Sequence, residues 1–363
     1  MDRMIGRALA LAVAGPVAFF ATIMFPGLVR ASAEWPVSSP EAVGIDHQAL
    51  DALLADLKND PNHDLKGIVV IRHGKLAAEW YFNGDDRNTL HDIRSATKSI
   101  TAILMGIAIN HHLIAGVDDP IGKYLPGLPE DGKQKIRIRD LLTMRSGLAA
   151  DDDDPDSPGN EDRLDQSTDW MKSVFAVPTR TPPGQNYLYC SLNAFITGAI
   201  VENAAGVPLD AFARKYLFLP LGIRNFSWRH VPINRVVGQG NLSITSRDEA
   251  AMGQLVLYNG RWRNKQLVGS MWIAASLANH VPISAVDPYA DFYGYMWYSK
   301  AEPVAGGTVL VHYASGNGGN KIYVVPSKDM VVAITSSAYH KGYGQRRSQD
   351  ILLRILAATP ASN

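Results

Sequence analysis

The chain has 363 residues, of which 46% are apolar and 19% are charged, and its 35 basic residues balance 35 acidic ones. This composition excludes a disordered chain and provides ample length for a large buried core. The zero formal charge gives no reason to expect a nucleic-acid partner. Cys190 is the single cysteine, so an internal disulfide is excluded. The sequence has no CxxC, HExxH or EF-hand pattern, so no metal site is expected.

The N-terminus carries the features of an export signal. Two arginines precede an apolar run at residues 8–29, which is followed by an Ala-Ser-Ala triplet at 31–33. This order predicts that residues 1–33 are a signal peptide and that the rest of the chain is periplasmic or secreted. The apolar run is also long enough to span a bilayer. In the alternative, residues 5–29 therefore anchor the chain in a membrane.

The first elements after this segment alternate between helix and strand. The stretch "DHQALDALLADLK" (46–58) has the leucine spacing of one helix face, with Asp46 as a suitable cap. The stretch "GIVVIRHGKLAAEWYF" (67–82) predicts two strands that turn at His73-Gly74. The apolar spacing over residues 95–110 again indicates a helix.

The middle of the chain is mostly helical. Residues 136–148 predict a short extended piece and a helix that a glycine ends. The acidic run "ADDDDPDSPGNEDRLDQ" (150–166) is rich in turn formers, and a solvated loop is favoured over a calcium site because the spaced ligands of a calcium loop are missing. Residues 191–206 predict a helix that ends at Gly206.

Strands gather at both ends of the chain that follows the N-terminal segment. Residues 308–337 hold three β-rich runs, and a last helix is expected over 345–358. The pattern predicts an α+β fold, with an antiparallel sheet flanked by helices. Residues 34–92 and 286–363 would form this sheet domain, and residues 93–285 a mostly helical inserted domain.

Ser95 and Lys98 stand three residues apart where the 95–110 helix begins, so both lie on one helix face. A serine hydroxyl becomes a nucleophile only beside a base, and a lysine acts as a base only where its surroundings keep it partly neutral. The alternative is a serine that caps the helix and a solvated lysine. Ser95 is the only serine with a lysine at the third following position, and no Gly-x-Ser-x-Gly pattern occurs.

Several segments in a fixed order resemble one known family. The stretch "LHDIRSATKSITAILMGIAINHHLIAGVDDPIGKYLP" resembles the nucleophile helix of the serine β-lactamase and penicillin-binding protein superfamily, in its class C β-lactamase-related branch. Later segments resemble this branch in the same order, namely 136–148, 182–206, 243–260 and 315–335. The resemblance covers about residues 38–357 and implies the β-lactamase/transpeptidase-like fold. It also implies that Ser95 is the acylated nucleophile and Lys98 its proton acceptor.

The resemblance places a second motif at Tyr189-Cys190-Ser191. It implies that Tyr189 passes a proton to the leaving group and that Ser191 borders the substrate site. Tyr187 is the competing tyrosine, but its spacing from the preceding Pro-Gly pair matches the family less well. Since a phenol needs a nearby cation to act in this way, Lys98 and Tyr189 are expected to titrate as a coupled pair. Cys190 is expected to be a buried small residue rather than a reactive thiol.

The chain departs from the family at the third motif, where β-lactamases carry Lys-Thr-Gly. The corresponding stretch is "VHYASGNGGN" (311–320), and two alignments remain open. Either Ala314-Ser315-Gly316 fills the motif, or His312 supplies the positive side chain. In both, a backbone N–H of Gly316 or Asn317 would be the second donor to the oxyanion, beside that of Ser95.

The missing lysine bears on the substrate, because a cation at this place would bind the carboxylate of a β-lactam or a peptide terminus. The sequence therefore predicts a serine hydrolase that cleaves small esters or amides and needs no cofactor, closest to carboxylesterases and 6-aminohexanoate-oligomer hydrolases. The alternatives are a β-lactamase or D-alanyl-D-alanine carboxypeptidase, and a non-catalytic cell-envelope binding protein that retains the fold. Aromatic residues at 289–297 either line an apolar pocket or pack in the core.

Overall fold

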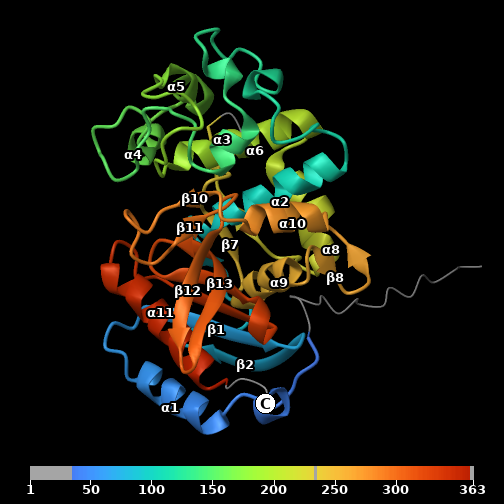
Figure 1. Cartoon of the computed structure of the whole chain (residues 1–363), viewed down its shortest axis with the longest axis vertical. Helices are drawn as coiled ribbons and strands as arrows, with labels where there is room; N and C mark the ends of the chain where they lie inside the picture. Colours follow the sequence, from blue (N-terminus) through green and yellow to red (C-terminus); the bar gives the residue numbers. More distant parts are fainter. Residues whose placement is uncertain (1–34, 233–234, 360–363) are drawn as a thin grey trace, which may run out of the picture. The chain divides into compact units, whose positions relative to one another are not determined.

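The structure is a computed structural model that describes residues 35–232 and 235–359 (Figure 1). The predicted signal peptide or anchor at residues 1–33 lies outside these residues. Within the described part of the chain, no helix is long and apolar enough to cross a lipid bilayer.

An eight-stranded antiparallel sheet is built from both ends of the described chain, as predicted. Its strand order is β10-β11-β12-β13-β14-β15-β1-β2. The strands are β1 (Leu65–Arg72), β2 (Lys75–Tyr81), β10 (Val281–Pro282), β11 (Phe292–Tyr293), β12 (Tyr298–Val304), β13 (Gly307–Gly316), β14 (Asn320–Val325) and β15 (Met330–Ser336). The early and late strands join where β1 pairs with β15, with Val69 opposite Ala333. The two predicted strands of 67–82 are thus β1 and β2, and the three β-rich runs of 308–337 are β13, β14 and β15.

Strands β14 and β15 are buried along their whole length. Such strands need apolar cover on both faces, and helices provide it. Helix α9 (Ser246–Leu257) packs against β14, β15 and β1. Helix α11 (Gly342–Ala357) contacts β12, β14 and β15 and packs on α1 (His47–Lys58). The helix predicted over 46–58 is α1, and Asp46 caps it by accepting from the N–H groups of Gln48 and Ala49.

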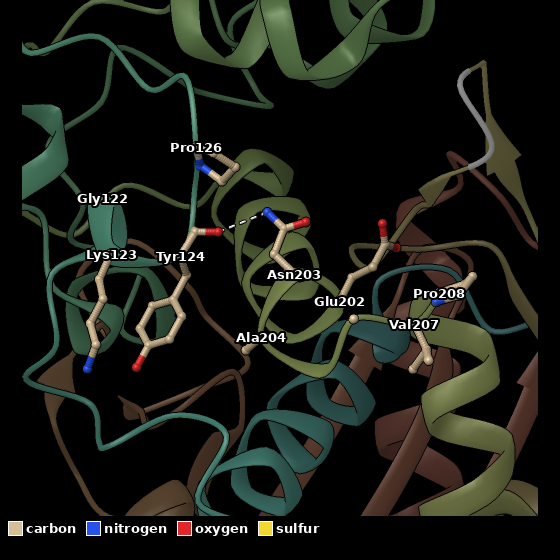
Figure 2. A pocket seen from close by; sticks show the side chains of 10 residues that line it. Gly122, Lys123, Tyr124, Pro126, Glu202, Asn203, Ala204, Val207 and Pro208 are labelled. Atoms are coloured by element: carbon tan, nitrogen blue, oxygen red, sulfur yellow. Dashed lines mark hydrogen bonds between the residues drawn. The ribbon is translucent and has the colours of Figure 1, made fainter.

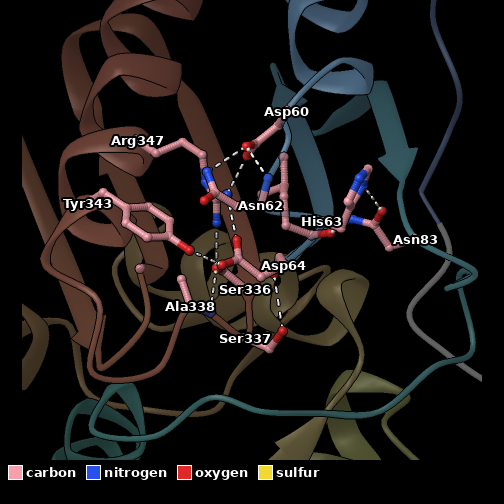
Figure 3. Close-up of polar contacts among 12 residues, drawn as sticks. Asp60, Asn62, His63, Asp64, Asn83, Ser336, Ser337, Ala338, Tyr343 and Arg347 are labelled. Atoms are coloured by element: carbon pink, nitrogen blue, oxygen red, sulfur yellow. Dashed lines mark hydrogen bonds and ion pairs between the residues drawn. The ribbon is translucent and has the colours of Figure 1, made fainter.

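A polar cluster fixes the end of α1 to α11 (Figure 3). Arg347 of α11 forms ion pairs with Asp60 at 2.5 Å and with Asp64 at 2.6 Å. The Tyr343 hydroxyl donates to Asp64, and Arg347 also donates to the Ser336 hydroxyl at 2.8 Å. The loop between α1 and β1 is therefore held to α11 by charge.

Two central helices carry the candidate site. They are α2 (Ala96–Asn110) and α6 (Ser191–Ala205), and they pack against each other. Residues 96–108 of α2 are all buried, and α2 also contacts β13. At this contact Gly316 of β13 has no room for a side chain, because a Cβ there would lie 2.1 Å from the carbonyl oxygen of Ile93. The close approach brings the third motif beside the start of α2.

The remaining elements are short. The helices are α3 (Ile138–Leu142), α4 (Glu161–Asp165), α5 (Trp170–Ala176), α7 (Leu209–Ala213), α8 (Leu219–Leu221) and α10 (Ser270–Leu277). A second sheet has three short strands, β3 (His91–Asp92), β4 (Ser227–Trp228) and β7 (Leu242–Ile244). Two further sheets are strand pairs, β5 (His230–Val231) with β6 (Arg235–Val236) and β8 (Arg261–Trp262) with β9 (Lys265–Gln266). Single turns are η1 (Glu41–Val43), η2 (Ile121–Lys123), η3 (Lys133–Lys135), η4 (Arg214–Phe218) and η5 (Pro326–Lys328). Among these, α3 is the helix predicted within 136–148.

Candidate active site

Ser95 is the last residue before α2, and its side chain makes no hydrogen bond that caps the helix. It is half-buried, whereas Lys98, one turn further on, is only 2% exposed. The Lys98 Nζ atom donates to the Ser95 Oγ atom at 2.8 Å. A capping serine with a solvated lysine is therefore not what the chain forms.

The backbone before Ser95 turns sharply to present it. Arg94 has a φ of 51°, in the left-handed region that side chains other than glycine rarely adopt. The turn is held by the N–H of Arg94, which donates to the Asp92 carboxylate at 2.9 Å, and by the Arg94 guanidinium, which lies 4.1 Å from the centre of the Tyr339 ring. Such conformations cost about 1 kcal/mol or more and are commonly found at active sites.

Lys98 connects α2 to two other parts of the chain. Its Nζ atom donates to the Ser191 Oγ atom at 3.0 Å and to the carbonyl oxygen of Gln239 at 3.1 Å. It also lies 5.1 Å from the centre of the Tyr189 ring. Ser191 is the first residue of α6. The structure thus brings together Ser95, Lys98, Tyr189 and Ser191, as the resemblance implied.

The electrostatics around Lys98 differ from the expectation that apolar surroundings keep it neutral. Burial lowers the pKa of Lys98, but the electrostatic interactions with Tyr189, Glu161 and Asp152 outweigh burial, and the pKa is raised. The ammonium form therefore dominates in the resting protein. Sequence reasoning missed this because the two carboxylates come from the run that was predicted to be a solvated loop.

Asp152 and Glu161 turn inward from the acidic run 150–166. The Asp152 carboxylate accepts from the Ser191 backbone N–H at 2.6 Å, and Glu161 Oε2 accepts from the Ser191 hydroxyl at 2.9 Å. Asn160, which is 3% exposed, shapes the loop by donating to the carbonyls of residues 151, 152 and 154. The loop prediction holds for residues 150–160, but residues 161–165 form α4, and the two acids contact the start of α6. Burial raises the pKa of Asp152, while Lys98 opposes this shift.

The two candidate tyrosines have different surroundings. Lys98 lies over Tyr189, whereas the Tyr187 ring packs edge-on against Tyr293 at 5.5 Å between centres. Burial raises the pKa of the Tyr187 phenol far above its usual value. Tyr189 is therefore the tyrosine placed to exchange protons with Lys98. Cys190, the residue before α6, is 1% exposed, as predicted. Burial raises the pKa of its thiol to about 12.

The third motif lies on β13 beside the start of α2. The buried Ala314 and Gly316 flank the half-buried Ser315. The Ser315 hydroxyl accepts a hydrogen bond from Lys321 Nζ at 2.8 Å, because Lys321 stands opposite Ser315 on the neighbouring strand β14. Burial lowers the pKa of Lys321 to about 7, so the amine is partly neutral at neutral pH.

His312 does not supply positive charge at neutral pH. It is 8% exposed on β13, and burial lowers its pKa to about 4. The geometry therefore favours the alignment in which Ala314-Ser315-Gly316 fills the motif. Asn317 is exposed, and its side chain accepts from the N–H of His340 at 2.8 Å. The backbone N–H groups of Gly316 and Asn317 as oxyanion donors stay a prediction.

A cavity of about 700 Å³ lies at the opposite end of α6 from Ser191 (Figure 2). Asn203 and Glu202 line it, and the Asn203 side chain donates to the carbonyl oxygen of Tyr124 at 2.8 Å. Ser191 and Asn203 are separated by about 18 Å along the helix axis, at 1.5 Å per residue. This cavity is therefore separate from the nucleophile.

Comparisons with known proteins agree with this geometry. A sequence model described as Beta-lactamase matches residues 50–355. The chain is 29% identical over 219 residues to a protein of Salmonella heidelberg (strain SL476) with the provisional name D-alanyl-D-alanine carboxypeptidase. This match covers 53% of the chain and 51% of the relative, so the chain spans about half the length of the curated relatives it matches.

Similar solved structures include a protein from Bacillus anthracis with the provisional name 6-aminohexanoate-dimer hydrolase, with a TM-score of 0.71 and 19% identity over 89% of this chain and 87% of the other. A class C beta-lactamase has a TM-score of 0.65 at 16% identity over 87% and 97% of the two chains. The hydrolase EstCE1, described as having promiscuous acyltransferase activity, has a TM-score of 0.66 at 17% identity over 86% and 98%. These likenesses confirm the predicted fold.

Proposed function

Because this chain belongs to the beta-lactamase family, we propose that it is a serine hydrolase that cleaves ester or amide bonds of a small substrate through an acyl-enzyme at Ser95. The observation that carries the proposal is the 2.8 Å contact between Lys98 Nζ and Ser95 Oγ. The serine is half-buried and is not used as a helix cap, and the lysine is almost fully buried. This combination suits a nucleophile with an adjacent proton acceptor.

In the proposed reaction, the Ser95 oxygen attacks the substrate carbonyl, and the proton of its hydroxyl passes to the Lys98–Tyr189 pair. Since the two groups are coupled, the reactive state is the one in which the pair has lost one proton. The bond to the leaving group then breaks, and the leaving group takes a proton from Tyr189. Water attacks the Ser95 ester in the second half of the cycle, and the acid product and the free hydroxyl are released.

The third motif supports esters and simple amides as substrates. Ala314 stands where the family's lysine would bind a substrate carboxylate, the neighbouring His312 is neutral, and the amine of Lys321 is buried and donates to the Ser315 hydroxyl instead. Among the similar structures are a provisionally named 6-aminohexanoate-dimer hydrolase and the hydrolase EstCE1. The Salmonella relatives favour a second candidate, a D-alanyl-D-alanine carboxypeptidase activity. From the N-terminal sequence, we also propose that the protein acts after export, in the periplasm or outside the cell.

The test is hydrolysis of p-nitrophenyl butyrate by the purified chain and by two variants whose folding is verified by circular dichroism. Ser95→Ala is expected to lose the activity, while Ser270→Ala, which alters an exposed serine, is expected to keep it. Equal activity in the native protein and Ser95→Ala would overturn the proposal. A cephalosporin and a peptide ending in D-alanyl-D-alanine, assayed in parallel, distinguish the alternatives.

A further inference from the structure

Four polar groups form a continuous hydrogen-bonded chain that ends at a carboxylate. Ser95 Oγ lies 2.8 Å from Lys98 Nζ, which lies 3.0 Å from Ser191 Oγ, which lies 2.9 Å from Glu161 Oε2. Lys98 and Ser191 are each 2% exposed, so solvent does not replace these partners. The proposed reaction uses Ser95 and Lys98 but gives no role to Glu161.

We propose that Glu161 is a positioning residue that acts through Ser191 and restricts the proton exchange of Lys98 to Ser95 and Tyr189. The inference rests on the proposed function of Ser95. It assigns a role to a residue of the acidic run, outside the motifs that the family resemblance identified.

Glu161 sets the direction of these hydrogen bonds, because some of the four groups can donate a proton and others can only accept one. An ionised carboxylate has no proton to donate, so the Ser191 hydroxyl must direct its hydrogen toward Glu161. The Ser191 oxygen is then an acceptor for Lys98. The carbonyl oxygen of Gln239, the partner at 3.1 Å, is also only an acceptor. Two of the N–H bonds of Lys98 are thereby committed to partners that can never return a proton.

The remaining position on the Lys98 nitrogen faces the two groups that react. In the ammonium form, its third N–H is directed at Ser95, and the nitrogen lies 5.1 Å from the centre of the Tyr189 ring. When the Lys98–Tyr189 pair has lost a proton, the vacated site on the nitrogen is this third one, because vacating either of the others would leave a buried acceptor without a donor. The lone pair is therefore directed at Ser95 when it is needed.

Without Glu161, the Ser191 hydroxyl could rotate and donate to the Lys98 nitrogen, in competition with Ser95. Asp152 binds the backbone N–H of Ser191 at 2.6 Å and also interacts with its side chain, but the hydrogen bond of the Ser191 hydroxyl goes to Glu161 Oε2 at 2.9 Å. Glu161 is held in place by α4, whose N-terminus Asn160 caps through the N–H of Asp162 at 3.0 Å. Its second oxygen accepts from Gln239 Nε2 at 3.4 Å.

The test uses Glu161→Gln, Ser191→Ala and the double variant, with the pH dependence of Ser95 labelling by a fluorophosphonate as the readout. The glutamine keeps the size of the side chain but offers N–H groups to Ser191. Each single variant is expected to lower the labelling rate at its high-pH plateau by about 10- to 100-fold. This loss is no larger than the smallest rate enhancement, about 100-fold, that an aligned general base contributes. The double variant is expected to be no slower than Ser191→Ala, because Glu161 acts through that hydroxyl.

A second readout separates positioning from a general loss of structure. The charged groups that face Lys98 are Tyr189, Glu161 and Asp152. Removing the charge of Glu161 should move the rising limb of the pH profile to lower pH, which mere loosening of the loop would not do. Asp162→Asn, which removes the same charge from an exposed neighbour, is the matched control and should change neither the plateau nor the limb.

Three results would overturn the inference. They are a plateau labelling rate for Glu161→Gln within twofold of that of the native protein, a rising limb of the pH profile that does not move, or a loss of labelling rate in the double variant that equals the product of the two single losses. Circular dichroism and thermal melting verify the fold of each variant. If Glu161→Gln does not fold, Glu161→Asp takes its place: it keeps the charge but withdraws the carboxylate from the Ser191 hydroxyl, so it is expected to lower the plateau and leave the rising limb unchanged. Failure of the proposed function is distinguishable, since the native protein would then show no labelling at Ser95.

Discussion

Lys98 Nζ and Ser95 Oγ lie 2.8 Å apart at the start of α2, with the lysine buried and the serine half-buried. The lysine also contacts Ser191 and the carbonyl of Gln239. Burying a lysine ammonium costs desolvation as well as side-chain entropy. The burial of this side chain among reactive groups is therefore better explained by chemistry than by stability.

Replacing Lys98 is expected to abolish most of the activity on esters. Lys98→Ala should lower kcat/KM by at least about 100-fold, the lower bound for an aligned base. Lys98→Arg should not restore it, because a guanidinium cannot accept a proton in proteins. Steady-state hydrolysis of p-nitrophenyl butyrate measures both, with Lys172→Ala, an exposed lysine, as the control. Activity within tenfold of native in Lys98→Arg would contradict a role in proton transfer.

His312 is expected to affect stability in acid rather than catalysis. Burial lowers the pKa of His312 from 6.5 to about 4. As the pH falls between these two values, His312 binds a proton in the unfolded chain but stays neutral in the folded chain. Stability is therefore lost on acidification by up to about 3 kcal/mol. Urea unfolding between these pH values should show a weaker pH dependence for His312→Gln than for the native protein. Loss of a limb near neutral pH from the ester-hydrolysis profile of His312→Gln would instead assign His312 to catalysis.

Glu249 of α9 should make the protein less stable as the pH rises. It is 0% exposed, and neither carboxyl oxygen has a hydrogen-bond partner among the described residues. Burial, reinforced by Asp248, raises the pKa of Glu249 well above 4.5. The folded chain thus keeps a proton that the unfolded chain releases above that value, and the free energy of unfolding falls with rising pH.

Glu249→Gln removes this titration. Its free energy of unfolding, relative to that of the native protein, should therefore increase between about pH 5 and about pH 8. Guanidinium unfolding at the two pH values measures the difference. A difference that stays constant with pH would show that Glu249 is ionised in the folded protein.

Arg347 is expected to be a major stabilising residue of the contact between α11 and the loop that follows α1 (Figure 3). Its side chain is 11% exposed, and its partners Asp60 and Asp64 are 14% and 16% exposed. Arg347→Ala should cost about 3–5 kcal/mol, because it leaves two partly buried carboxylates without a counter-charge. Arg354→Ala, on the same helix but in an exposed pair with Asp56, should cost less than about 1 kcal/mol. Equal costs in urea unfolding would contradict this distinction.

The elements that sequence reasoning predicted are those with a strong local signal. The leucine spacing and Asp46 cap of α1, the turn at His73-Gly74, and the Gly206 stop of α6 each fix an element without reference to the rest of the chain. The strands β3, β4 and β7 escaped prediction because two or three residues carry no periodicity. Such strands exist only through their partners.

The residues of the site also divide into those with a local sequence signal and those that depend on distant partners. Ser95 and Lys98 are predictable because their spacing on one helix is local. The contact of Glu161 with Ser191, and that of Lys321 with Ser315, join residues that are separated by loops or by strand pairing. In the sequence, Glu161 differs in nothing from its exposed acidic neighbours. The raised pKa of Lys98 could not be predicted either, because besides Tyr189 it depends on Glu161 and Asp152, which only the fold brings to the lysine.

The most direct test of the central claim is to identify the acylated residue during turnover. The purified protein is mixed with p-nitrophenyl butyrate, quenched in acid within milliseconds to seconds, and digested for peptide mass spectrometry. The account predicts one butyryl group on Ser95, formed in a burst with p-nitrophenol and absent in Ser95→Ala. Turnover with the acyl group on another residue, or with no acylated peptide at any quench time, would contradict it.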